Sequence, residues 1–169
     1  MTNSGSVTST EVFKQLNSAD VERVSQLLSK ATSVDGVRPL SEHAWLHLHS
    51  SESGLHILGF LNDEFSAYAH VDITDLVDGT STELVVSPSA RNQGLGHAMV
   101  ERALELSPDG RLRLWAHGAT VAAQSFADSI GYLLNRSLWQ MRRSLFAPLP
   151  ATQIPQGVRI RTFDPLTDI

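Results

Sequence analysis

The chain contains 169 residues, of which 41% are hydrophobic and 18% charged, a composition typical of one globular domain with a sizeable core. Its formal net charge of -5 argues against a nucleic-acid partner, and its lack of cysteine excludes disulfides, cysteine-ligated zinc and a cysteine nucleophile. No apolar run approaches the roughly 20 residues of a membrane span, and the N-terminus lacks the features of a signal peptide. We therefore expect a cytoplasmic protein without a membrane partner.

The N-terminal part of the chain predicts two helices. Residues 1–10 are small and polar and indicate a frayed end or the start of a strand. Ser18 can cap a helix that extends to about Lys30, because apolar residues follow it at helical spacing. A loop with glycine and proline comes next, and we expect a second helix from Ser41.

Two strands are expected in the middle of the chain. Residues 54–61 and 65–73 predict strands, and the polar residues 62–64 between them are typical of a hairpin connection. A polar loop at 75–81 then leads to a further strand.

That further strand is followed by a glycine turn and a helix. The apolar run Leu84, Val85 and Val86 stops shortly before Pro88, which cannot donate to a sheet ladder. The turn reads R-N-Q-G-L-G at 91–96 and leads into a helical pattern. Its successive backbone N–H groups, with the positive end of the helix dipole behind them, predict a site for phosphate oxygens.

The spacing of this turn, R-x-x-G-x-G, differs from both the Rossmann and the Walker phosphate-binding patterns. Gly94 and Gly96 allow the backbone to approach a ligand closely, and Arg91 can add a charge-assisted contact. The alternative interpretation is a glycine turn that begins an ordinary helix of an α/β fold.

The periodicity of the next segments predicts the remaining elements. We expect a helix at 95–106, a strand at 111–117, a helix at 120–130 that ends at Gly131, and a last strand at 132–145. Together with the earlier elements, this order predicts an α/β fold.

The C-terminal part of the chain differs in composition. Residues 146–157 hold three of the seven prolines and no charge, as in a linker. Residues 158–163 alternate in the manner of a strand, and one strand cannot bury itself alone. We therefore expect the front of a second domain there; the alternative is a C-terminal strand that docks on the sheet.

The turn in its context resembles the acetyl-CoA pyrophosphate loop of the GNAT acetyltransferases, and the order of elements over residues 10–145 is similar to theirs. The resemblance implies an α/β fold of the GNAT (acyl-CoA N-acyltransferase) type, with a mixed, mostly antiparallel sheet flanked by helices. It also implies acetyl-CoA as the acetyl donor.

Several separated segments narrow the resemblance to the mycothiol synthase family, which is built from two tandem GNAT domains. They read A-T-S-V-D-G-V-R-P-L-S-E (31–42), E-L-V-V-S-P (83–88), L-W-A-H-G (114–118), Q-M-R-R-S-L (140–145) and I-P-x-G-V-x-I-R-T (154–162). The resemblance implies a GNAT domain at 1–145, a linker at 146–157 and, at 158–169, the opening strand of a second, truncated GNAT domain.

This resemblance implies acetyl transfer from acetyl-CoA to the cysteine amine of cysteinyl-glucosaminyl-inositol, which gives mycothiol. The implied partners are these small molecules, with no nucleic acid and no membrane, and the protein is expected to be a monomer with a covalently linked second GNAT domain. In the family pattern the pantetheine arm follows the strand and the pyrophosphate sits on the turn. The cofactor contacts then fall on Leu84, Val85, Val86, Arg91, Asn92, Gln93, Gly94, Leu95, Gly96 and His97.

The family pattern also implies one acceptor contact. The acidic residue of the V-D-G-V-x-P-x-x-E loop falls on Glu42, whose carboxylate can bond sugar hydroxyls or pair with an ammonium group. The alternative is an ordinary residue of a helix N-terminus beside the cap Ser41, favoured there by the helix dipole.

The sequence departs from the family pattern where active domains carry a tyrosine that protonates the CoA thiolate. Ala127 stands at the tyrosine position and Thr120 at that of an asparagine, and a methyl group cannot donate a proton. The departure implies an N-terminal half that binds acetyl-CoA without turning it over. The alternatives are a stand-alone GNAT enzyme acting on another amine and a non-catalytic acetyl-CoA-binding scaffold.

The sequence assigns no catalytic residue. Glu83, His70 and His117 are the candidates for a general base, but residues of this kind are more often ordinary polar residues near a strand end, and we assign no catalytic role to any of them. A second cluster, His43, His47 and His49, has only a weak metal-binding pattern, so we expect solvated helix histidines and no metal.

Overall fold

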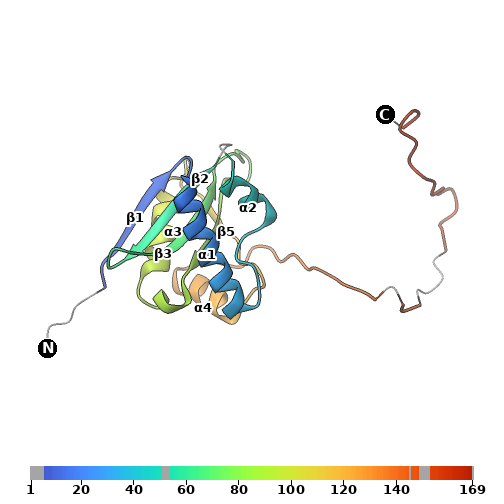
Figure 1. Ribbon diagram of the computed structural model, residues 1–169. Helices are drawn as coiled ribbons and strands as arrows, with labels where there is room; N and C mark the ends of the chain where they lie inside the picture. Colours follow the sequence, from blue (N-terminus) through green and yellow to red (C-terminus); the bar gives the residue numbers. More distant parts are fainter. Residues whose placement is uncertain (1–5, 51–53, 145, 149–152, 169) are drawn as a thin grey trace. The chain divides into compact units, whose positions relative to one another are not determined.

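The computed structural model describes residues 6–50, 54–144, 146–148 and 153–168. The chain divides into two units, Met1–Leu133 and Leu134–Ile169, and each is described by itself. The helices and strands that the structure describes all lie in the first unit (Figure 1).

A mixed sheet forms the centre of the first unit. Its strands, in their order across the sheet, are β1 (Thr8–Phe13), β2 (Leu55–Leu61), β3 (Glu64–Asp72), β4 (Thr80–Val86) and β5 (Leu112–Leu114). The pairs from β1 to β4 are antiparallel, and only β4 and β5 run parallel. The expected mixed, mostly antiparallel sheet is thus confirmed.

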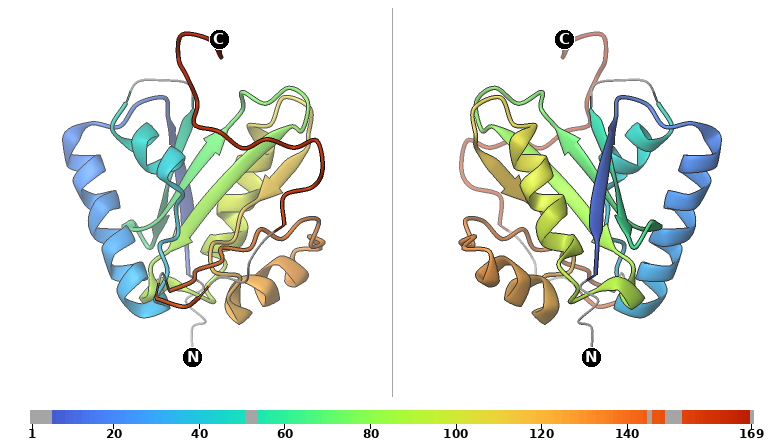
Figure 2. Two further views of the ribbon diagram at one scale, coloured as in Figure 1. Left: turned by 90° about the vertical axis from the view of Figure 1, so that its right-hand side faces the viewer. Right: turned by 90° about the vertical axis from the view of Figure 1, so that its left-hand side faces the viewer.

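Helices cover both faces of this sheet (Figure 2). The α-helices are α1 (Ser18–Asp35), α2 (Glu42–Leu48), α3 (Leu95–Glu105) and α4 (Val121–Ser129), and a short 3-10 turn, η1, spans Pro88–Ala90. Successive side chains of a strand point to opposite faces of the sheet. Tyr68 and Val85 therefore join an apolar cluster with α1 and α2 on one face, while Ala67 and Ala69 join a second cluster with α3 on the other. The sheet therefore separates two apolar cores.

The first helix differs from its predicted bounds. Its cap is Asn17, whose side chain accepts a hydrogen bond from the backbone N–H of Asp20 at 2.9 Å, and Ser18 is the first helical residue. The helix continues to Asp35, beyond Lys30, because the first residue that stops it is Gly36 in the left-handed conformation (φ 71°). Apolar spacing alone does not locate such an end.

Other predicted elements are confirmed. Ser41 caps α2, with its hydroxyl accepting from the backbone N–H of Ala44 at 3.2 Å. Asn62 and Asp63 have φ values of 50° and 64°, as the tight hairpin between β2 and β3 requires.

The fifth strand is shorter than the sequence predicted. The strand was expected over 111–117 but spans only Leu112–Leu114, because the chain turns at Gly118 and Ala119, which both have positive φ. The last strand expected over 132–145 is wrong for its described residues, 132–144, which form no strand; Trp139 and Met141 are 87% and 90% exposed. An alternating pattern forms a strand only where a neighbour satisfies its backbone groups.

The second unit contains neither a helix nor a strand among its described residues, 134–144, 146–148 and 153–168. Residues 158–163 are exposed and form no strand, so their assignment to a second domain remains a prediction, as does the linker at 146–157. Across the described part of the chain, no helix is both long enough and apolar enough to cross a membrane.

Candidate functional site

The two parallel strands separate halfway along β4. β5 pairs only with Thr80–Thr82, and the last backbone hydrogen bond between the two segments runs from the Trp115 N–H to the Thr82 carbonyl, at 3.0 Å. From Glu83 to Val86, β4 has a strand neighbour only on the β3 side within the described part of the chain. On the other side, this part of β4 has no strand partner, and its backbone groups other than the Val86 carbonyl, which accepts a hydrogen bond from Arg91, can pair with a ligand that lies along the strand.

The glycine turn follows directly and leaves the start of α3 open. Gly94, with φ 84°, occupies the cap position and offers no side-chain hydrogen bond. The first intrahelical bond runs from the Ala98 N–H to the Gly94 carbonyl at 3.1 Å, so the N–H groups of Leu95, Gly96 and His97 have no acceptor within the helix. Such a helix end, at the positive end of the dipole, suits an anion.

The side chain of Arg91 is engaged within the protein. Its guanidinium donates to both carboxylate oxygens of Asp35, at 2.8 and 2.7 Å, and its Nε donates to the Val86 carbonyl at 3.2 Å. These bonds raise the pKa of Arg91 and lower that of Asp35. Arg91 thereby ties the turn to the end of α1 and to β4, and its predicted contact with a phosphate would require it to leave Asp35.

The other residues of the turn lie at the surface or against α4. Asn92, Gln93 and His97 are exposed, and a Cβ on Gly96 would lie 3.3 Å from the ring of Phe126. Glycine at 96 therefore lets α4 pack against the first turn of α3.

Glu83 lies at the centre of a hydrogen-bond network that joins three segments. Its carboxylate accepts from the Ser41 N–H at 2.6 Å, from the Ser41 hydroxyl at 2.7 Å and from Nε2 of His117 at 3.1 Å. Burial by itself would raise the pKa of Glu83, but these bonds lower it, while the bond to Glu83 raises the pKa of His117. The structure thus brings together two of the predicted base candidates, and Ser41, predicted only as a helix cap, joins them.

The third candidate, His70, is the cross-strand partner of Glu83 but bonds toward α2. Its Nε2 lies 3.1 Å from Nδ1 of His47, and burial, together with neighbouring histidines, lowers its pKa to about 4. His70 is therefore neutral at pH 7, and His47 is not the solvated helix histidine expected from the sequence. Within the described residues, no group of three His, Cys, Asp or Glu side chains is arranged to hold a metal ion.

The remaining predicted positions lie at the start of α2 and in α4. Glu42 is the exposed first residue of α2, next to the network of Ser41. Thr120 caps α4 by accepting from the Ala123 N–H at 3.2 Å, and Ala127 lies within that helix.

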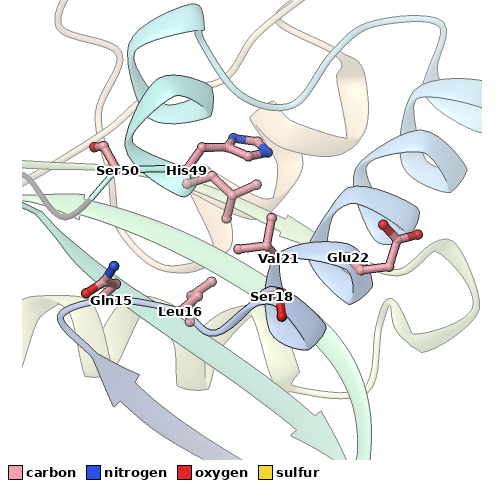
Figure 3. A pocket seen from close by; sticks show the side chains of 8 residues that line it. Gln15, Leu16, Ser18, Val21, Glu22, His49 and Ser50 are labelled. Carbon is pink, nitrogen blue, oxygen red and sulfur yellow. The ribbon is translucent and has the colours of Figure 1, made fainter.

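A separate cavity of about 270 Å³ lies between the start of α1 and the end of α2 (Figure 3). Its lining consists of Gln15, Leu16, Ser18, Val21, Glu22, Leu48, His49 and Ser50. None of the predicted site residues lines this cavity.

The split between β4 and β5, with an uncapped helix N-terminus beside it, defines a protein that can hold an extended ligand with a phosphate group. The model of the acetyltransferase (GNAT) family matches residues 21–132, and the chain belongs to this family.

Two curated relatives are mycothiol acetyltransferases. That of Streptosporangium roseum is 48% identical over 153 residues, which are 89% of this chain and 45% of the relative. That of Acidothermus cellulolyticus is 47% identical over 163 residues, 94% of this chain and 50% of the relative. The chain thus spans about half the length of the curated relatives it matches.

Solved structures agree on the fold. A GCN5-related N-acetyltransferase from Sphaerobacter thermophilus has a TM-score of 0.64 at 23% identity and covers 98% of this chain and 55% of its own. The ribosomal-protein-S18-alanine N-acetyltransferase of Escherichia coli has a TM-score of 0.52 at 19% identity, over 74% of this chain and 77% of its own. The GNAT fold implied by the sequence is confirmed.

Proposed function

We propose that this chain binds acetyl-CoA, with the pyrophosphate on the N–H groups at the start of α3 and the pantetheine arm along the open side of β4. The observation that carries this proposal is the uncapped first turn of α3, directly after the part of β4 that β5 leaves unpaired. In this arrangement Leu84, Val85 and Val86 contact the pantetheine arm. Asn92, Gln93, Gly94, Leu95, Gly96 and His97 surround the pyrophosphate, and Arg91 holds their turn in place.

We further propose that the chain is the N-terminal half of an enzyme that acetylates the cysteine amine of cysteinyl-glucosaminyl-inositol to form mycothiol. Support comes from relatives named mycothiol acetyltransferase, at 48% and 47% identity, of which this chain matches about half. A second GNAT domain, linked covalently through residues 146–157, supplies the other half of a monomeric cytoplasmic enzyme. Glu42 contacts the acceptor sugar.

The absence of a proton donor at Ala127 bears on the chemistry of this half. Without a donor near the sulfur, the CoA thiolate leaves poorly, so acetyl-CoA bound here turns over slowly. A stand-alone enzyme for another amine remains the second candidate, supported by the match of the acetyltransferase (GNAT) family model to residues 21–132. A purely cofactor-binding scaffold is the third, supported by Ala127.

Calorimetry of the purified chain with two ligands tests the binding proposal. Acetyl-CoA is compared with acetyl-pantetheine, which carries the same thioester and arm but lacks the pyrophosphate together with the nucleoside attached to it. We expect acetyl-CoA to bind at least tenfold more tightly, because only its pyrophosphate reaches the start of α3. Equal affinities would refute the assignment of the turn, and absence of binding would refute the proposed function.

A further inference from the structure

We propose that acid releases α2 from the sheet, because the imidazole pair formed by His47 of α2 and His70 of β3 can hold one proton but not two. The release follows from the packing of α2 and does not depend on the proposed function. Only its consequence for Glu42, the first residue of α2, rests on that function.

α2 is attached to the domain by few contacts. Of its seven residues only Ala44 and Leu48 are buried, and the others are exposed or half-buried. In the described part of the chain, its hydrogen bonds to the sheet are those from its cap, Ser41, to Glu83 and the bond within the imidazole pair. Loss of the imidazole bond therefore removes a large share of what attaches α2.

His70 lies within a group of four imidazoles that α2 and the sheet contribute. Its Nε2 lies 3.1 Å from Nδ1 of His47. The ring centroids of three neighbours lie 5.1, 6.0 and 6.0 Å from its own, those of His47, His43 and His56. Because His70 is only 2% exposed and His56 only 1%, solvent does little to screen a charge placed on either ring.

The bond within the pair limits the number of protons that the two rings can take. With one added proton, an imidazolium N–H of one ring still donates to the lone pair of the other. With two, both facing nitrogens carry hydrogen, and two donors meet across 3.1 Å. A Cβ on Gly54 would lie 2.8 Å from Nε2 of His70 and 3.3 Å from Nδ1 of His47, so no acceptor side chain fits there. The second proton therefore breaks the bond.

The charged and titratable groups around His70 act in both directions. Those that face it are His47 and His43 on α2, His56 on β2, Glu83 on β4 and Asp72 on its own strand. The two carboxylates favour the protonated ring. Burial and the neighbouring imidazoles outweigh them and lower the pKa of His70 to about 4.

Two other contacts of this group do not cancel the effect. His43 lies 3.5 Å from Asp72 and forms an ion pair when protonated, but its side chain is 59% exposed, so the pair stabilises α2 little. Nδ1 of His56 lies 2.8 Å from the hydroxyl of Tyr68, and burial lowers the pKa of His56 as well. Since His56 bonds within the sheet, its protonation breaks no hydrogen bond of α2.

The pKa of His70 gives the sign and the size of the effect. An ordinary imidazole has a pKa of 6.5, so below that pH the released state binds a proton that the attached state excludes. Lowering the pH from 7 to 5 should therefore favour release about 20-fold. Glu83 stays ionised over this range, because its pKa lies below the ordinary value, and the bonds from Ser41 persist.

Release of α2 displaces Glu42, the proposed acceptor contact, and leaves the start of α3 unchanged. Acid should thus disturb the acceptor side of the domain before the acetyl-CoA side. By thermodynamic reciprocity, an acceptor bound at Glu42 favours the attached state of α2.

Amide hydrogen exchange of the unliganded chain, measured by NMR at pH 7 and pH 5, tests the release. A seven-residue helix is not stable alone in water, so the amides of residues 45–48 lose protection when α2 leaves the sheet. After correction for intrinsic exchange, their protection should fall about 20-fold between pH 7 and pH 5. Low concentrations of urea should leave this exchange unchanged but should accelerate that of α3, which needs global unfolding.

Two variants and a matched control assign the effect to the imidazole pair. His70→Gln keeps a polar side chain toward His47 but takes no proton, so the effect of pH on residues 45–48 should fall to about threefold or less. His47→Gln, whose amide oxygen can accept from a protonated His70, should also reduce it and serves if His70→Gln does not fold. His49→Gln, at the exposed end of α2, should retain the full effect.

The outcomes separate the release of α2 from the proposed function. Equal protection of residues 45–48 at the two pH values would overturn the release, and so would a urea dependence equal to that of α3. A full pH effect in both His70→Gln and His47→Gln would overturn the role of the pair. Failure to bind acetyl-CoA at pH 7 would refute the proposed function alone, since exchange is measured without ligand.

Discussion

The backbone N–H groups in the first turn of a helix have no acceptor within the helix, and α2 and α3 differ in what satisfies them. At α2, the Ser41 hydroxyl caps the Ala44 N–H, and both the hydroxyl and the backbone N–H of Ser41 donate to the partly buried Glu83. At α3, Gly94 supplies no side chain, and the first N–H groups have no acceptor in the helix. One helix N-terminus is capped by a side chain of the protein, and the other has no side-chain cap.

If acetyl-CoA binds as proposed, the difference separates polar groups that stabilise the domain from polar groups that bind the ligand. Changes in the network beneath α2 should alter the free energy of unfolding and leave acetyl-CoA affinity nearly unchanged. Changes at the start of α3 should have the reverse effect. The effects expected below run from about 3 kcal/mol to about 0.5 kcal/mol.

The largest expected effect is a loss of stability at low pH, caused by the buried His70 beneath α2. His70 is 2% exposed, and its pKa is about 4 in the folded protein against 6.5 ordinarily. Below pH 6.5 His70 is protonated in the unfolded chain but stays neutral in the folded protein. The free energy of unfolding therefore falls by about 2 kcal/mol at pH 5 and about 3 kcal/mol at pH 4. Urea unfolding between pH 7 and pH 5, where most carboxylates stay ionised, measures this loss.

Replacement of His70 by Gln removes the titrating group but retains a polar side chain toward His47. The decline in stability from pH 7 to pH 5 should become shallower, while His97→Gln, at the exposed start of α3, should keep the original slope. Equal slopes in the unaltered chain and His70→Gln would contradict the burial of a neutral imidazole beneath α2.

The cap of α2 comes next. Ser41→Ala removes the acceptor for the Ala44 N–H and one donor to Glu83, and should cost about 1–2 kcal/mol of unfolding free energy. Acetyl-CoA affinity should stay within twofold, because the start of α3 is untouched. Thermal unfolding and calorimetry on the same sample check both. Thr120→Ala, which removes the cap of the solvent-exposed α4, should lower the free energy of unfolding by less. A large loss of acetyl-CoA affinity in Ser41→Ala would show that the first turns of α2 and α3 are coupled.

At α3, a new carboxylate should separate binding from stability. His97→Glu places a negative charge in the first turn, where it repels a pyrophosphate; its favourable interaction with the helix dipole offsets its repulsion from Glu101, one turn further along. Acetyl-CoA affinity should fall about tenfold, or about 1.4 kcal/mol, while the unfolding free energy changes by less than about 0.5 kcal/mol. Ala122→Glu makes the same change in the first turn of α4 and should not affect affinity. Equal losses in both variants would indicate general charge repulsion rather than a site.

The first turn of α3 could be predicted from the sequence, whereas the network around Ser41 at the start of α2 could not. The end of β4, the glycine turn and the start of α3 are local signals within about a dozen residues, and the structure has each of them where expected. The network of Glu83 joins residues 42 and 34 positions away, and no local pattern connects them. The strand expected over 132–145 failed for the same reason, since a strand depends on a partner that periodicity does not name.

Arg91 shows this limit within the predicted site itself, because its carboxylate partner lies 56 positions away. Both side chains are partly exposed, at 32% and 24%, so the pair contributes only about 0.5 kcal/mol of stability. Asp35→Asn should therefore barely change unfolding but should lower acetyl-CoA affinity two- to threefold, since the turn loses its anchor on α1. Calorimetry measures the affinity, and Arg91→Lys, which cannot form the bidentate pair, should show the same loss. A gain of affinity in Asp35→Asn would instead identify Arg91 as a phosphate ligand that Asp35 restrains.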